Sequence, residues 1–300
     1  MKLVTYRKTK TSKARLGVIN DGQVTDVQKL GLLSGSQLPD TMLRLIDLGP
    51  DATFALSNLL NKKETRLPPG ISVPVENVTL LAPIPTPRKN IFGIGLNYVE
   101  HVAESAKNLD TAKDLPTKPV VFSKPPTAVI GTGDSIQHNS KMTQQLDWEV
   151  ELAVIIGTKA TRIEAKNAMD HVFGYSIMND VSARDNRRAG QWIFSKGQDT
   201  FAPFGPCIVT KDEITDPHNL NLWLKKNGVE KQSSNTKHLL FNIPTLISDL
   251  SSGMTLEPGD IIATGTPSGV GAGRDPQEWM WPGDVIAVSY THLRAHETIP

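Results

Sequence analysis

The stretch LDWEVELAVIIG, residues 146–157, places two glutamates within an apolar β-strand. Side chains alternate across a strand, so Glu149 and Glu151 point to the same face, roughly 7 Å apart at a rise of about 3.3 Å per residue. Two carboxylates on a buried face repel each other and lose hydration, and each would be driven to its neutral form unless a positive charge lies between them. Either this strand faces water, or a cation belongs beside the glutamates.

Size and charge limit the partners of the chain. Its 300 residues, 38% hydrophobic and 21% charged, can form one large core or two cores of unequal size. The 32 lysines and arginines nearly balance 31 acidic residues, so we expect small-molecule partners rather than nucleic acid or an anionic membrane. Cys207 is the single cysteine, which excludes an internal disulfide and a cysteine zinc cluster. The sequence begins without a signal-peptide pattern and has no membrane-spanning apolar run, so we expect a cytoplasmic protein.

The N-terminal part combines short strands with helices. Apolar runs flank the turn NDG at residues 20–22, which is typical of a β-hairpin. Residues 41–49 and 51–60 have the apolar spacing of helices. A proline-rich connector follows, and we place the domain boundary between residues 70 and 88.

We therefore assign residues 1–75 to a small N-terminal β-containing domain and residues 76–300 to a larger domain. The larger domain contains many short β-rich runs, among them KPVVFSK, EVELAVIIG and VFGYSIMND. Only residues 163–172 and 241–252 have convincing helical patterns. This ratio predicts an α+β fold that is β-dominated, with mixed strands rather than a regular βαβ array.

A third carboxylate follows another apolar run. Asp180 lies at the start of DVSARD, at the end of a buried strand, where an inward carboxylate has little to pair with. Arg184 lies four residues further on, so a plain salt bridge between the two is one interpretation. The other is that Asp180 joins Glu149 and Glu151 as a third oxygen ligand. Such a set favours Mg²⁺, Mn²⁺ or Ca²⁺ over zinc and leaves positions open for water or substrate.

The segment GLNYVEHVAES predicts a short helix with a polar face. Asn97 is a suitable helix N-cap, with Glu100 three residues later. His101 and Glu104 then fall at i and i+3, close enough for the carboxylate to orient the imidazole, although such a pair on an exposed helix often has no special role. The long polar stretch at residues 106–119 is typical of a mobile lid.

Two glycine-rich stretches are weaker signals. Residues 93–95 lack the third glycine of a dinucleotide-binding fingerprint, and residues 265–273, GTPSGVGAG, lack the Lys-Ser/Thr ending of a P-loop. The latter follow a strand, so their backbone amides and the hydroxyls of Thr264 and Thr266 could bind a carboxylate, or they could form a plain turn.

Lys196 and Gln198 lie in an aromatic, proline-punctuated segment, WIFSKGQDTFAPFGP. A partly desolvated lysine is well suited to hold an enolate or a carboxylate. The alternative is a lysine whose aliphatic stem packs on the surface while its ammonium group reaches water.

Taken in order, these segments resemble the fumarylacetoacetate hydrolase family. The matching stretches are GLNYVEHVAE, VVFSKPPTAVIG, LDWEVELAVIIG, GYSIMNDVSARD, KGQDTFAPFGP and PGDIIATGTPSGVG, from about residue 91 to residue 286. The resemblance implies a mixed β-roll catalytic domain, often preceded by a smaller N-terminal domain, and a homodimer.

The resemblance also implies a role for each candidate residue. The implied ligands of Mg²⁺ or Mn²⁺ are Glu149, Glu151 and Asp180. The implied catalytic residues are the lid-borne, water-activating pair His101 and Glu104, and Lys196. The implied binding residues for a 2-oxo acid are Arg184, Gln198, Thr266 and Lys124. The tail at residues 286–300 departs from the family pattern and looks like a foreign or read-through ending, which puts the closing strand in question.

We expect a metal-dependent hydrolase that cleaves a carbon–carbon bond in an acylpyruvate or related 1,3-diketo acid, of the fumarylacetoacetate or fumarylpyruvate type. Attack of water on the distal carbonyl would expel a pyruvate enolate, whose charge the cation and Lys196 stabilise. The alternatives are oxaloacetate decarboxylation and a 2-hydroxymuconate-type isomerisation or hydration in aromatic catabolism, since each passes through a similar enolate. A non-enzymatic, metal-bound ligand sensor is the remaining hypothesis, and no partner domain or DNA-binding motif supports it.

Overall fold

The structure is a computed structural model that describes residues 1–61, 68–108, 114–291 and 293–298. Its largest component is an 11-stranded mixed sheet in the order β4-β3-β2-β1-β14-β11-β10-β17-β6-β7, with β5 also paired to β1. The strands of this sheet are β1 (Lys2–Arg7), β2 (Arg15–Asn20), β3 (Gln23–Asp26), β4 (Ser72–Pro74), β5 (Thr79–Leu81), β6 (Ile91–Gly95), β7 (Val120–Lys124), β10 (Val150–Ile156), β11 (Val172–Asn179), β14 (Ile208–Thr210) and β17 (Ile261–Ala263). Strands β17 and β6 pair in parallel, and the other pairs are antiparallel.

A second sheet has four antiparallel strands in the order β16-β15-β18-β19. These strands are β15 (Asn221–Lys226), β16 (Val229–Asn235), β18 (Val285–Tyr290) and β19 (Leu293–Thr298). Two short ladders join β9 (Leu146–Asp147) to β12 (Ser182–Ala183) and β8 (Val129–Ile130) to β13 (Ala202–Pro203). The unusual tail thus forms two paired strands, β18 and β19, so a closing strand is present.

Within the described residues, six α-helices accompany the sheets: α1 (Val27–Leu33), α2 (Met42–Asp47), α3 (Gly49–Leu60), α4 (Val99–Asn108), α5 (Ile193–Lys196) and α6 (Ile243–Gly253). The helices predicted at residues 41–49, 51–60 and 241–252 are confirmed as α2, α3 and α6. Residues 163–172 contain a 3-10 helix, η3 (Ala165–His171), where an α-helix was expected. Of the predicted lid at residues 106–119, residues 109–113 lie outside the described residues. No described helix is long and apolar enough to cross a membrane.

The prediction of a β-dominated α+β fold is confirmed, and the predicted hairpin is present. Asn20 pairs with Gln23 across the turn, and Asp21 and Gly22 have φ values of 48° and 71°. Two consecutive residues with positive φ are the signature of the type I′ turn, whose twist matches that of the flanking strands.

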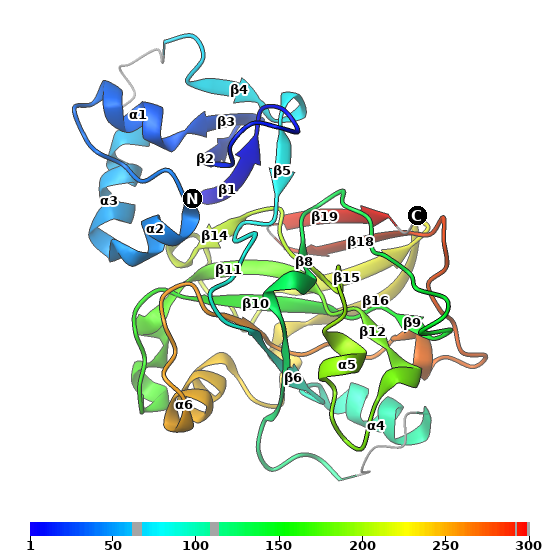
Figure 1. Cartoon of the computed structure of the whole chain (residues 1–300). Helices are drawn as coiled ribbons and strands as arrows, with labels where there is room; N and C mark the ends of the chain where they lie inside the picture. The colour runs from blue at the N-terminus through cyan, green and yellow to red at the C-terminus, as the bar shows by residue number, and fades with distance from the viewer. Residues whose placement is uncertain (62–67, 109–113, 292, 299–300) are drawn as a thin grey trace.

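Figure 1 shows β1–β5 and α1–α3 gathered at one end of the molecule, beside the remaining strands. The sheet nevertheless continues across this junction, because β1 pairs with β14 as well as with β2. The division predicted between residues 75 and 76 falls in a short 3-10 helix, η1 (Val75–Asn77), and stays a prediction.

Strand β10 is buried along its whole length, with neighbours on both sides in the sheet. Its even-numbered residues pack in one apolar cluster, while Ala153 and Ile155 pack in another. Glu149 and Glu151 share the parity of Ala153 and Ile155, and they are 4% and 1% exposed. The glutamates therefore do not face water, which leaves the interpretation that requires a cation.

Candidate metal centre and active site

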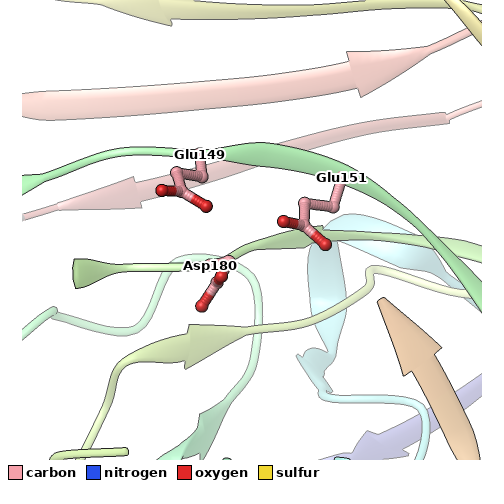
Figure 2. Close-up of side chains that lie close together, drawn as sticks. All are labelled: Glu149, Glu151 and Asp180. Atoms are coloured by element: carbon pink, nitrogen blue, oxygen red, sulfur yellow. The ribbon is translucent and has the colours of Figure 1, made fainter. Parts of the chain in front are cut away.

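Three carboxylates converge at one end of β10 and β11. Glu149 immediately precedes β10, Glu151 lies within it, and Asp180 follows the last residue of β11. The antiparallel pairing of these strands brings Asp180 beside Glu149, and the Asp180 backbone N–H donates to the Glu149 carbonyl at 2.8 Å. One oxygen from each carboxylate lies within 4.8 Å of the other two, and all three side chains are buried. Figure 2 shows both glutamate side chains extending from one strand toward Asp180.

The charge balance at this cluster is uneven. Burial raises the pKa of Glu151 well above its usual value, and the carboxylates of Asp180 and Glu149 raise it further. Burial also acts to raise the pKa of Glu149, but Lys196 and Arg184 outweigh it and hold that pKa well below its usual range. In the metal-free protein Glu151 therefore favours its neutral form, and only further positive charge beside it would favour the carboxylate. Three buried oxygen donors that need such positive charge fit a divalent cation such as Mg²⁺ or Mn²⁺.

Both predicted lysines contact this cluster. Lys196, at the end of α5, donates to Glu149 at 2.9 Å, to Asp180 at 2.5 Å and to the Ser182 hydroxyl at 2.8 Å. Lys124, on β7, is fully buried and donates to the other oxygen of Asp180 at 2.5 Å. Lys196 is therefore an interior residue rather than one that reaches from a loop into water.

Arg184 pairs with two carboxylates other than Asp180. Its Nε donates to Asp147 at 2.8 Å, and its second terminal nitrogen lies 2.6 Å from Glu149. The salt bridge to Asp180 considered from the sequence is therefore wrong, because the short strand β12 separates Asp180 from Arg184 and the two are not on one helical turn. Asp147 was missed, although it has the same alternation as Glu149 and Glu151 and could have been found from it.

His101 and Glu104 lie on α4, as predicted, and contact each other. His101 Nδ1 is 3.1 Å from Glu104 Oε2, and His101 Nε2 is 3.4 Å from the Ser105 hydroxyl. Since a carboxylate can only accept, Nδ1 carries the hydrogen in this contact and Nε2 is the basic nitrogen. Glu104 thus orients the imidazole of His101, and the basic nitrogen of that ring is on the side away from Glu104.

Asn97 does not cap α4, so that prediction was wrong. The helix begins at Val99, and the Asn97 amide nitrogen donates instead to the carbonyls of Thr264 and Phe241 at 2.7 and 3.0 Å. Its amide oxygen accepts from the Phe241 backbone N–H at 2.7 Å. Asn97 therefore fixes the start of the His101 helix against two distant segments.

A cavity open to solvent lies beside these groups. Its lining residues are Ile94, Gly95, Leu96, His101, Ser105, Glu149, Arg184, Arg187, Trp192, Ser195, Lys196 and Thr266. Of the predicted site residues, the cavity is thus lined by His101, Glu149, Arg184, Lys196 and Thr266. Gln198 is not part of this lining, and its amide donates to the Phe194 carbonyl at 3.1 Å.

Besides Asp147, two further residues at the site were not found from the sequence. Arg187 lines the cavity with its guanidinium 4.9 Å from the centre of the Trp192 ring. Gln232, on β16, accepts from the Val150 backbone N–H at 2.9 Å and donates to the Thr266 hydroxyl at 2.7 Å. Nothing in the sequence indicates that a glutamine so far along the chain binds the backbone N–H of Val150, which lies between Glu149 and Glu151.

The fold and donor set define a β-dominated protein with a buried three-carboxylate site for a divalent cation. The sequence model described as Fumarylacetoacetate (FAA) hydrolase C-terminal matches residues 90–298. The chain belongs to the fumarylacetoacetate hydrolase family, as the resemblance predicted.

Relatives in this family have different names. Oxaloacetate tautomerase YisK of Bacillus subtilis is 41% identical over 91% of this chain and 91% of its own length. A fumarylacetoacetate hydrolase from Exiguobacterium antarcticum is 37% identical, with a TM-score of 0.81 over 100% of this chain and 99% of its own. A maleylpyruvate hydrolase from Sphingobium sp. SYK-6, solved with manganese(II) and pyruvate, is 30% identical, with a TM-score of 0.76 over 100% and 98%. The family therefore includes both isomerising and hydrolysing enzymes.

Proposed function

We propose that the protein is a metal-dependent oxaloacetate tautomerase that interconverts the keto and enol forms of this 2-oxo acid. The observation that carries the proposal is that His101, an imidazole oriented by Glu104, lines the same cavity as Glu149 of the carboxylate cluster. Tautomerisation needs such a proton carrier. The name of the 41% identical relative supports the same reaction. The C–C hydrolase expected from the sequence becomes the second candidate.

In this proposal, one set of residues binds the cation and the substrate, and another transfers the proton. Glu149, Glu151 and Asp180 would hold Mg²⁺ or Mn²⁺. That cation supplies electrostatic stabilisation of the negative charge that develops on the C2 oxygen. Arg184 and Lys196 line the cavity and provide positive charge for the substrate carboxylates.

His101 moves the proton. Its Nε2 takes a proton from C3 of the keto form, which generates the enolate, and returns it to the C2 oxygen to give the enol. Glu104 keeps the opposite nitrogen protonated and the ring in place, and it stabilises the imidazolium that forms between the two transfers. No water enters this sequence, and the reverse path runs through the same groups.

The test follows the enol of oxaloacetate directly. Metal-stripped protein is reloaded with Mg²⁺ or Mn²⁺ and mixed with enol oxaloacetate, and the ultraviolet absorbance of the enol is recorded against a protein-free control. We expect metal-dependent acceleration of its loss with no release of pyruvate. Pyruvate release without faster ketonisation would overturn the tautomerase and indicate a decarboxylase.

Hydrolysis of an acylpyruvate is the second candidate because the maleylpyruvate hydrolase, solved with manganese(II) and pyruvate, matches the entire chain. In that reaction His101 would take its proton from water, which attacks the distal carbonyl, and the C–C bond would break to release pyruvate enolate. Acetylpyruvate incubated under the same conditions distinguishes the two: pyruvate release from it supports the hydrolase.

We also propose a homodimer, on the family resemblance alone, and a cytoplasmic location, as expected from the sequence. Size-exclusion chromatography with light scattering measures the first, and a mass close to that of one 32.7 kDa chain would contradict it.

A further inference from the structure

The glycine-rich loop at residues 265–273 binds carboxylates that belong to the protein itself. The sequence suggested that its amides could receive a carboxylate ligand. In the structure, four of its backbone N–H groups are used by three acidic side chains. The contacts are Gly265 to Glu151 (2.8 Å), Gly269 to Glu104 (2.9 Å), and Gly271 and Ala272 to the two oxygens of Asp147 (2.6 and 3.0 Å).

Each of these carboxylates serves a different part of the site. Glu151 belongs to the metal cluster, and Glu104 orients His101. Asp147 accepts a hydrogen bond from Nε of Arg184, and a terminal nitrogen of the same guanidinium forms an ion pair with Glu149. One loop therefore fixes the relative positions of a metal ligand, the proton carrier and a cation of the cavity, with backbone donors that have no side-chain freedom to lose.

Gly273 is the position where this arrangement leaves no room for a side chain. A Cβ built there would lie closer than 3.0 Å to the Cγ, Cδ and Oε1 atoms of Glu104. Gly273 belongs to a 3-10 helix, η7 (Gly271–Gly273), and its φ lies outside the left-handed region, so alanine is compatible with its backbone. The conflict is with the far end of one flexible side chain, which can swing aside while the fold stays intact.

We propose that the loop at residues 265–273 is the positioning element of the active site, and that the absence of a side chain at Gly273 lets Glu104 reach both Gly269 and His101. Gly273 is thus a positioning residue that acts through Glu104. The proposal rests on the proposed function insofar as His101 is the proton carrier.

A double-mutant cycle tests the proposal. Gly273→Ala should lower kcat for oxaloacetate ketonisation by about 10–100-fold, part of the 10²–10⁴-fold that an oriented acid–base group contributes. Its Mn²⁺ affinity should change by less than about 2-fold, since the atoms nearest to a Cβ at Gly273 belong to Glu104 rather than to the carboxylate cluster. In a Glu104→Ala background, where the conflicting atoms are gone, Gly273→Ala should have no further effect on kcat. The matched control is Gly253→Ala at the end of α6, whose Cβ would meet nothing within 4 Å.

A second measurement does not depend on turnover. In protein labelled with ¹⁵N-histidine, the His101 signals, assigned by their loss in His101→Gln, report which ring nitrogen carries the hydrogen. Gly273→Ala should shift these signals as Glu104→Ala does, and Gly253→Ala should leave them in place. If the wild-type protein has no tautomerase activity but the signals shift as expected, the proposed function fails and the positioning proposal stands. Unchanged signals in Gly273→Ala, or an equal loss of kcat in the Glu104→Ala background, overturn the positioning proposal.

Discussion

Glu149 and Glu151 share one strand face, yet they have different partners. Glu149 contacts two cations, Lys196 and Arg184. Glu151 accepts from the Gly265 backbone N–H, and no ion pair to it is found among the described residues. Both glutamates are proposed ligands of the cation, but their surroundings in the metal-free protein are opposite: cations surround Glu149, and carboxylates surround Glu151.

We predict that glutamine substitutions separate these two effects. Glu149→Gln should lower the free energy of unfolding of the metal-free protein by about 2–3 kcal/mol, because it removes the partner of two buried cations. Glu151→Gln should raise it by about 1 kcal/mol, because it removes a buried carboxyl group whose pKa is raised by burial and by the neighbouring carboxylates, and such a group destabilises the folded state at neutral pH. In both variants the increase in melting temperature caused by Mn²⁺ should be lost. Chemical denaturation and thermal scans with and without Mn²⁺ measure these effects, and equal destabilisation by the two variants would contradict the prediction.

His101 lines the cavity but is not one of the three carboxylates proposed to bind the cation. Its role in proton transfer can therefore be separated from metal binding. We predict that His101→Gln lowers kcat by about 10²–10⁴-fold, the usual contribution of a general acid–base group. Mn²⁺ affinity, measured by the paramagnetic resonance of free Mn²⁺, should stay within about 2-fold of wild type. Parallel loss of kcat and Mn²⁺ affinity would show that His101 maintains the metal site rather than moving a proton.

The sequence predicts those site residues that follow a local rule. Alternation along the strand places Glu149 and Glu151 together, and the end of the next strand places Asp180 beside them. The i, i+3 spacing likewise pairs His101 with Glu104. The remaining contacts join segments far apart in the chain, such as Gln232 to Val150, 82 residues away, and they depend on a sheet topology that no local pattern determines.

At the level of elements, β1, β2 and α1 are joined by a single buried carboxylate. Asp26 caps α1 by accepting from the Lys29 backbone N–H at 3.0 Å, and it also accepts from Tyr6 at 2.8 Å and from Arg15 at 2.5 Å. Burial acts to raise the pKa of Asp26, but Arg15, the Lys29 amide and Tyr6 together hold it below its usual value. A carboxyl whose folded-state pKa is lowered stabilises the protein above its unfolded pKa.

We predict that Asp26→Asn costs about 2 kcal/mol of unfolding free energy at pH 7, since asparagine keeps the cap but loses the charge that Arg15 requires. The wild-type advantage should disappear as the pH falls below about 4, the unfolded-state value, toward the lower folded-state pKa. Urea denaturation of the wild type and of Asp26→Asn at pH 7 and pH 3 measures this difference in unfolding free energy. Asp40→Asn, which removes an exposed ion pair with Lys13, should cost less than about 1 kcal/mol, and a similar loss in both variants would contradict the prediction.

Elements with a strong local signal were predictable, and those made by tertiary contacts were not. The hairpin turn, α2, α3 and α6 have the required turn residues or apolar spacing. The stretch at residues 163–172 has helical spacing too, but it forms the 3-10 helix η3, which packs against α6. Helix α1 was missed because its seven residues contain Gly31 and are too short for a clear period.

At the scale of the whole molecule, the N-terminal and C-terminal parts share a sheet and a core. β1 pairs with β2 and β5 in the N-terminal part and with β14 in the other. One buried cluster contains residues from both parts, including Leu45, Ile155 and Ile208. The exposed ion pair between Arg88 and Asp47 adds little to this junction.

We therefore predict that the metal-free protein unfolds in one cooperative transition, because neither part can bury its apolar face without the other. Leu45→Ala should cost about 2–5 kcal/mol and lower the midpoint of the entire transition, as followed both by calorimetry and by Mn²⁺ binding after partial heating. Arg88→Ala, at the surface of the same junction, should lower the free energy of unfolding by less than about 1 kcal/mol. If Leu45→Ala instead splits the transition, with the metal site surviving the first step, the N-terminal part folds independently. The boundary near residue 75 would then separate two stability units, and the continuous sheet would be an interface between domains rather than one core.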